Sequence, residues 1–118
     1  MNPSPVDTKT GLQRAAGYEE LYESLLRLYA QRGATAGERL RSAIAQGDSA
    51  EAQRLAHTLK GSSAQVGAVE VERRAATLED RLGEAVAAEE LEPALAALEQ
   101  ALREALDWLA AGPLRPPA

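Results

Sequence analysis

The sequence predicts an all-α fold, an antiparallel four-helix bundle preceded by a short extra N-terminal helix. Its 118 residues fit one domain. Small helix formers and helix formers without branching at Cβ dominate an apolar fraction of 45%, which contains no Phe, one Trp and three Tyr. Apolar residues also recur at spacings of three and four along four long segments. Each segment has a charged opposite face, as antiparallel neighbours in a bundle require.

The first two predicted helices occupy the N-terminal half. Asp7 is a typical N-cap for a short helix that we expect to end near Ala16, before a glycine. The second segment covers residues 18–46, where Gly33 and Gly37 weaken the middle, so one long helix and two shorter ones both remain open. Its apolar positions are Leu21, Tyr22, Leu25, Leu28, Tyr29, Leu40 and Ile44.

The third helix is expected to begin near Ser49. Gly47 ends the preceding helix, Asp48 is an N-cap, and Glu51 follows it three residues later as in a capping box. Gly67 is expected to end this third helix. Its predicted stripe comprises Leu55, Leu59, Ser62 and Val66, where the small Ser62 would let two helices pack closely.

The last two helices are predicted from Val69 to about Ala87 and from a turn at residues 87–90 onward. Pro93 suits the first turn of the final helix, where a missing N–H costs nothing. The fourth helix has its apolar stripe at Val71, Ala75, Leu78, Leu82 and Val86, and the fifth at Leu91, Leu95, Leu98, Leu102, Leu106 and Leu109. Prolines near both ends predict a linker at 1–6, a bundle at 7–111 and a Pro-rich tail at 112–118.

Composition excludes several classes of function. The chain has no Cys and one His, which rules out disulfides and leaves little for a metal site. A net charge of -5 without a dense basic stripe argues against binding nucleic acid. No apolar run approaches the roughly 20 residues that span a bilayer, and the first ten residues lack a signal-peptide core. We therefore expect a cytoplasmic protein without direct membrane contact.

The one histidine, His57, shares a helix face with Lys60, Gly61 and Ala64, at offsets of three, four and seven residues. This face lies off the apolar stripe, so the imidazole is expected to be exposed. A glycine inside a helix costs roughly 1 kcal/mol relative to alanine, and close approach by another molecule would explain Gly61. The pattern fits a nucleophilic imidazole beside a cation that can hold an anion, and the alternative is a solvated surface histidine.

The string Ala-His-Thr-Leu-Lys-Gly-Ser-Ser at 56–63, followed by Val-Gly-Ala at 66–68, resembles the hallmark of histidine-containing phosphotransfer (HPt) domains, the modules of multistep phosphorelays. One departure is Tyr18, where relatives often carry Asp or Asn after the glycine. Other similar positions are Gly11-Leu12, Gly17, Leu21-Tyr22, Leu25-Leu26, Gly47-Asp48, Arg54-Leu55-Ala56 and Leu78-Glu79.

The resemblance implies a phosphoryl carrier without ATP-binding or kinase domain of its own. His57 would take a phosphoryl group from a receiver-domain aspartate and pass it to another, while Lys60 offsets charge on the phosphoryl oxygens. Glu79, 22 positions after the histidine, would accept a hydrogen bond from its Nδ1–H and orient the ring. Gly61 and Ala64 would permit close docking. The alternatives are that Lys60 is only a solvated cation and that Glu79 only pairs with an arginine.

The expected partners are receiver domains of a hybrid kinase, of a response regulator, or of both. The chain itself is expected to be the cytoplasmic C-terminal module of a membrane-bound sensor kinase or a free-standing carrier. The resemblance implies no cofactor on this chain, with Mg²⁺ on the receiver, and we expect a monomer. Residues 1–68 carry eight basic and seven acidic side chains, whereas 69–111 carry four and eleven, so the His57 half suits an acidic partner better. Leu12 and Tyr18 would extend the docking face or lie in the core.

Two rival functions share this pattern. One is the N-terminal phosphoacceptor module of a chemotaxis-type histidine kinase, which an attached ATP-binding domain phosphorylates. The other is a helical docking adaptor that has lost transfer. The intact His57, Lys60 and Gly61 argue against the adaptor.

Overall fold

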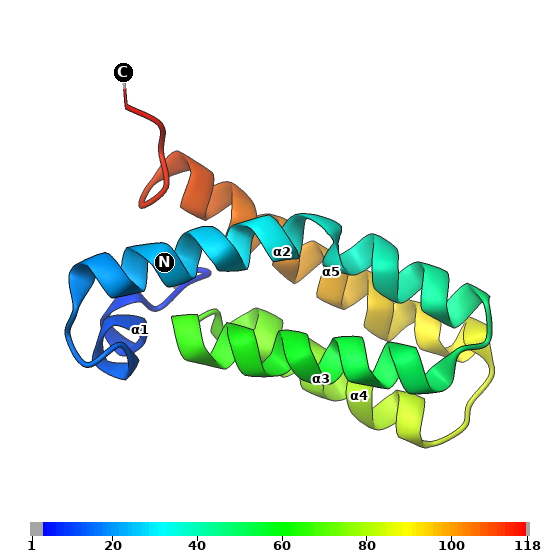
Figure 1. Ribbon diagram of the computed structural model, residues 1–118. Coiled ribbons are helices and arrows are strands. Elements are labelled where there is room, and N and C mark those ends of the chain that lie inside the picture. Colours follow the sequence, from blue (N-terminus) through cyan, green and yellow to red (C-terminus); the bar gives the residue numbers. More distant parts are fainter. Residues whose placement is uncertain (1–3, 118) are drawn as a thin grey trace.

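The computed structural model describes residues 4–117, which form five α-helices and, within that range, no strand. The helices are α1 (Thr8–Arg14), α2 (Glu19–Ala45), α3 (Ser49–Val66), α4 (Val69–Gly83) and α5 (Ala88–Ala111). In the bundle, α2 packs against α3 and α5, and α4 packs against the same two helices. Figure 1 shows α1 across one end of this bundle, where it contacts α3 and α2. The predicted all-helical bundle is confirmed.

Aspartates cap two of the helices, as predicted. The Asp7 carboxylate accepts a hydrogen bond from the backbone N–H of Thr10 at 3.1 Å, and Asp48 accepts one from the N–H of Glu51 at 3.1 Å. The second cap is only half of a capping box, because the Glu51 carboxylate binds Arg54 instead of returning to the N-cap. The positive charge of a guanidinium holds this carboxylate more strongly than a backbone N–H does.

One continuous helix, α2, spans the two glycines that left its length open. A Cβ at Gly33 would lie 3.3 Å from the Leu106 side chain of α5, and one at Gly37 would lie 3.3 Å from the Glu99 side chain. The glycines therefore allow α5 to approach α2 closely, and this packing stabilises the helix where its own propensity is weakest.

The predicted apolar stripes account for most of the core, with two shifts in register. On α2, Leu26 is buried while Leu21 and Leu28 are exposed. On α3, the buried serine is Ser63, whereas Ser62 is only half-buried and bonds back to a carbonyl of its own helix. The largest fully buried side chains are Val6, Leu40, Ser63, Val71, Leu78, Leu95, Leu98 and Leu109.

The connection between α4 and α5 was predicted too late in the chain. The fourth helix ends at Gly83 instead of near Ala87, and Ala85 adopts a left-handed conformation with φ 54°. The last helix begins at Ala88, so Pro93 is its sixth residue and does not lie in the first turn. Its ring therefore deprives the exposed Glu89 carbonyl of the usual i+4 partner.

Described residues of both predicted flanking segments contribute to the bundle, whereas residues 1–3 and 118 of these segments lie outside the described range. Val6, assigned to the linker, is 1% exposed, and the next backbone N–H, that of Asp7, donates to the carbonyl of Gly67 at 2.8 Å. Leu114, in the Pro-rich tail, packs partly against the core. None of the five helices is long and apolar enough to cross a membrane.

Candidate functional site

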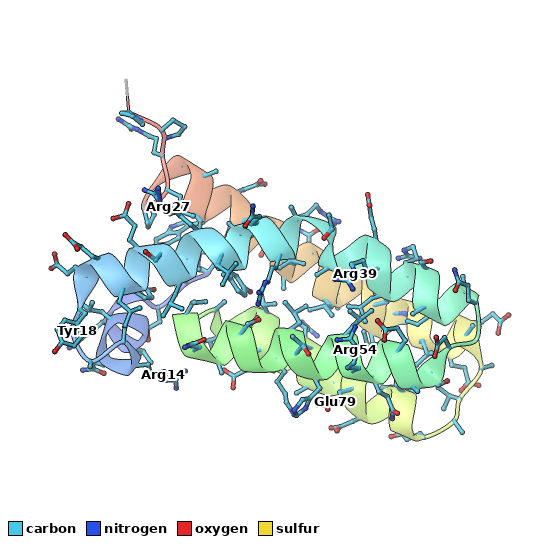
Figure 2. The ribbon with its side chains drawn as sticks, in the orientation of Figure 1. Arg14, Tyr18, Arg27, Arg39, Arg54 and Glu79 are labelled. Atoms are coloured by element: carbon cyan, nitrogen blue, oxygen red, sulfur yellow. The ribbon has the colours of Figure 1, made fainter. Side chains whose placement is uncertain are left out.

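The candidate site lies on the exposed middle of α3. The His57 side chain is 69% exposed, although the neighbouring Ala56 is fully buried. The helix therefore anchors the backbone in the core while it presents the imidazole to solvent. Figure 2 shows Glu79 near α3 on the side away from α2.

Glu79 of α4 fixes one ring nitrogen of His57. The Nδ1 atom lies 2.8 Å from Oε2 of Glu79. An ionised carboxylate can only accept hydrogen bonds, so Nδ1 carries the proton in the neutral ring. The lone pair then resides on Nε2, which is the atom available for attack on an electrophile.

Lys60 contacts the other oxygen of the same carboxylate. Its Nζ lies 2.6 Å from Oε1 of Glu79, and its side chain is 35% exposed. The hydrogen bond from Lys60 is the main cause that lowers the pKa of Glu79, and the same bond raises the pKa of Lys60. The positive charge of Lys60 thus keeps the Glu79 carboxylate ionised, and the ionised carboxylate accepts a hydrogen bond from His57. Within residues 4–117, Glu79 forms an ion pair with Lys60, contacts the His57 ring, and pairs with no arginine.

The surface beyond the histidine is open. A Cβ at Gly61 would meet no atom of residues 4–117 within 4 Å, so packing among the described residues does not require a glycine there. The carbonyl of Ala64, one turn further, accepts a hydrogen bond from the Arg14 guanidinium. Of the two proposed extensions of this face, Tyr18 is 67% exposed, whereas Leu12 packs partly against the core.

Sequence reasoning missed a groove between α2 and α3, beside the histidine face. Its volume is about 490 Å³, and Arg32, Arg39 and Arg54 line it together with leucines. The spacing of seven between Arg32 and Arg39 of α2 was a usable signal, because it places both on one helix face.

A buried polar pair in the core was also not predicted from the sequence. The hydroxyls of Tyr29 and Ser63 lie 2.8 Å apart, and burial raises the pKa of Tyr29 to about 12.

Among residues 4–117, no three His, Cys, Asp or Glu side chains gather closely enough to hold a metal ion.

Comparison with known proteins identifies one matching family and one similar fold. The family model of the Hpt domain matches residues 24–111. A solved structure, the HPT domain from the Hpt sensor hybrid histidine kinase of Shewanella, superimposes with a TM-score of 0.83 at 21% sequence identity, over 97% of each chain. No curated protein matches the sequence.

Proposed function

The chain belongs to the Hpt family of histidine phosphotransfer domains, which carry phosphoryl groups in phosphorelays, and from this premise we propose that His57 is the phosphorylated residue. The observation that carries the proposal is that the one histidine of the chain is exposed and is held at Nδ1 by Glu79. This arrangement directs the lone pair of Nε2 to solvent, where a partner protein can reach it.

The proposed reaction is a direct displacement at phosphorus. The Nε2 lone pair attacks the phosphorus of an aspartyl phosphate on a receiver domain, the N–P bond forms, and the bond from phosphorus to the aspartyl oxygen breaks. The aspartate leaves as a carboxylate with the bonding electrons. No proton has to be removed first, because the proton of the ring resides on Nδ1. Transfer to a second receiver is the reverse displacement.

The neighbouring charges have separate roles in this proposal. Phosphorylation at Nε2 places positive charge on the ring, and the Glu79 carboxylate stabilises it through the bond to Nδ1–H. Lys60, which shares the Glu79 carboxylate with His57, offsets charge on the phosphoryl oxygens. Gly61 and Ala64 leave space in which the receiver surface approaches the ring.

Phosphorelay domains of this family interact with receiver domains. We infer that this chain works as a monomer in the cytoplasm, as a carrier that receives its phosphoryl group from a partner and does not bind ATP itself. The likeness to a domain of a hybrid sensor kinase supports a place in the same kind of assembly. Mg²⁺ would then belong to the receiver.

The test is transfer of labelled phosphate. A receiver domain that carries labelled aspartyl phosphate is mixed with the wild-type chain and with His57→Gln, whose fold is checked by circular dichroism. We expect an acid-labile, base-stable label on the wild type and none on the variant.

Other outcomes point to the rival functions. Label that comes only from an ATP-loaded histidine-kinase domain would favour the chemotaxis-type module. Label from neither source would favour the adaptor. Label on His57→Gln would show that the nucleophile is a different residue.

A further inference from the structure

Arg54 of α3 lies one helical turn before His57, on the side of the helix that faces α2. Residues three apart on a helix are neighbours on its surface, with Cβ atoms about 5–6 Å apart. Lys60 has the same spacing on the other side of the histidine, toward Glu79 of α4. Figure 2 shows Arg54 on the α2 side of α3 and Glu79 on the opposite side. The histidine therefore has one cation on each side.

The charge that phosphorylation would bring leaves a place for this second cation. Side chains on a helix lean toward its N-terminus, so the exposed ring of His57 leans over the turn that carries Arg54. A phosphoryl group on the ring carries roughly two negative charges, as on other phosphorylated side chains. Together, Glu79 and this group would then exceed the positive charge of Lys60 and the ring by about one unit. One further cation would balance the site.

Glu51 holds Arg54 in a two-point contact. The Nε and Nη2 atoms of Arg54 lie 2.9 Å and 2.5 Å from the two carboxylate oxygens of Glu51. Glu51 is the third residue of α3, where a glutamate ordinarily returns to the backbone of the N-cap. Its two oxygens are occupied by the guanidinium instead. The helix thus forgoes half of a capping box, and the carboxylate holds an arginine one turn from the histidine.

This contact can be exchanged for another anion. The side chains of Arg54 and Glu51 are 57% and 36% exposed, so water and salt weaken their attraction. A phosphoryl group offers the guanidinium the same two-point geometry with about twice the charge. The hydrogen bond from Arg54 is the main cause that lowers the pKa of Glu51, and the charge of Arg39 on α2 contributes to it. A second cation therefore remains near Glu51 when Arg54 leaves.

We propose that Arg54 binds the phosphoryl oxygens at His57 during transfer and gives up the Glu51 carboxylate to do so. This rests on the proposed function, in which His57 is the phosphorylated residue. Lys60 and Arg54 then hold the group from both sides of the ring while the N–P bond forms or breaks. Only ion pairs and hydrogen bonds are exchanged at Arg54, so no proton or electron moves there. The planar fork of an arginine matches two phosphoryl oxygens, which the point charge of a lysine does not.

The test compares Arg54→Gln with a matched pair on α4. Arg73 binds Glu70, three residues earlier, in another exposed pair, so Arg73→Gln is the control. Single-turnover transfer is measured against the concentration of a receiver that labels the wild type. At saturating receiver we expect Arg54→Gln to be slower by about three- to tenfold, less than loss of an enclosed donor costs because Arg54 is exposed. The half-saturating concentration should stay within about twofold. Arg54→Lys should recover part of the rate, and Arg73→Gln should match the wild type.

Two further readouts need no receiver. Labelling of His57 by phosphoramidate, a small phosphoryl donor, should slow in Arg54→Gln by a similar factor, because Arg54 acts on the phosphoryl group itself. In NMR spectra of the arginine side chains, the Nε–H signal of Arg54 should shift when His57 is phosphorylated, whereas the signal of Arg73 should stay. Circular dichroism checks the fold of each variant. If Arg54→Gln does not fold, the Arg54 signal of the wild type decides alone.

The outcomes separate this proposal from the function on which it rests. Equal rates for Arg54→Gln and Arg73→Gln would overturn this proposal alone. Slower transfer from the receiver with phosphoramidate labelling at the wild-type rate would show that Arg54 contacts the receiver instead, and would overturn it too. Absence of label on the wild type from every donor would overturn the proposed function and this proposal with it.

Discussion

The middle of α3 and its C-terminal end differ in what holds their polar groups. In the middle, His57, Lys60 and Glu79 form a surface cluster, and their polar contacts are with one another. At the end, groups from elsewhere bind the helix: the hydroxyl of Tyr22 donates to the carbonyl of Val66 at 2.8 Å, in a buried bond. Reactive groups and fold-determining groups thus occupy separate parts of one helix, so each can be changed without the other.

The largest effect on stability should come from alanine substitutions at two glycines, one beside the C-terminal end of α3 and one in its middle. Gly11 of α1 lies against the end of α3, and a Cβ there would be 2.4 Å from the Val66 carbonyl oxygen and 2.5 Å from the Tyr22 ring. Backbone cannot move aside as a flexible side chain can, so Gly11→Ala should lower the free energy of unfolding by about 3 kcal/mol. Urea unfolding measures this loss.

The matched substitution in the middle of α3 should have the opposite sign. A Cβ at Gly61 meets nothing within 4 Å, so Gly61→Ala should raise the free energy of unfolding by about 0.5–1 kcal/mol. Its transfer rate should fall if a partner approaches the ring as closely as we propose. Equal stability changes in the two alanine variants would remove the distinction between the two parts of the helix.

The second effect concerns transfer. Lys60→Gln removes the cation that shares the Glu79 carboxylate with His57. We expect transfer from a receiver to slow by about tenfold to hundredfold, which is less than the roughly 10²–10³ that loss of a donor costs in the enclosed site of an enzyme, because Lys60 is partly exposed. Stability should hardly change, because the pair with Glu79 lies at the surface. Single-turnover transfer measures the rate, and Lys9→Gln, on α1, is the control. An unchanged rate would make Lys60 a solvated cation only.

The third effect returns to the end of α3. Tyr22→Phe keeps the ring but leaves the buried Val66 carbonyl without its partner, which should cost about 1–2 kcal/mol of unfolding free energy. Tyr18→Phe is the control, because that side chain is 67% exposed. Transfer by Tyr22→Phe should match the wild type at temperatures where both are folded. A stability change that Tyr18→Phe shares would show that the hydroxyl bond is not its cause.

Patterns among residues close in sequence predicted much of this fold, and contacts between residues distant in sequence explain the features that were left open or predicted wrongly. The caps at Asp7 and Asp48 depend on neighbouring residues, so the sequence alone located them. The continuity of α2 through Gly33 depends on α5, which is distant in sequence. The end of α4 was misplaced because alanines after Gly83 favour a helix, whereas the chain must turn there to begin α5.

The candidate site shows the same division. The face of His57, Lys60 and Gly61 follows from helical spacing alone. The contact of Glu79 with His57 was predicted from the family resemblance, because the spacing of residues within one helix does not predict contacts between α3 and α4. The groove was missed because it needs two helices: the leucines of α2 were assigned to an apolar stripe facing the core, and Arg54 of α3 joins them only when the helices pack.

The smallest effect is the dependence of stability on pH at Glu79. Lys60, and to a lesser extent His57, lower the pKa of this carboxylate below its ordinary value of 4.5. A carboxyl group whose pKa is lower in the folded state stabilises the fold above its unfolded pKa, and this contribution is lost as pH falls through the folded value. The wild type should therefore exceed Glu79→Gln in stability at pH 6, and the difference should shrink steadily once the pH drops below 4.5. Urea unfolding from about pH 3 to about pH 7 measures it.

The cause can be separated from the carboxylate itself by a second background. In Lys60→Gln, the same Glu79→Gln change should give a smaller pH-dependent difference, because the hydrogen bond from Lys60 is the largest cause of the lowered pKa. High salt should shrink the difference in the wild type too, since the pair is at the surface. A difference that stays constant across the pH range would mean that Glu79 stabilises α3 and α4 by packing. The cluster around His57 would then be part of the scaffold, and the contrast between the two parts of α3 would fail at this residue.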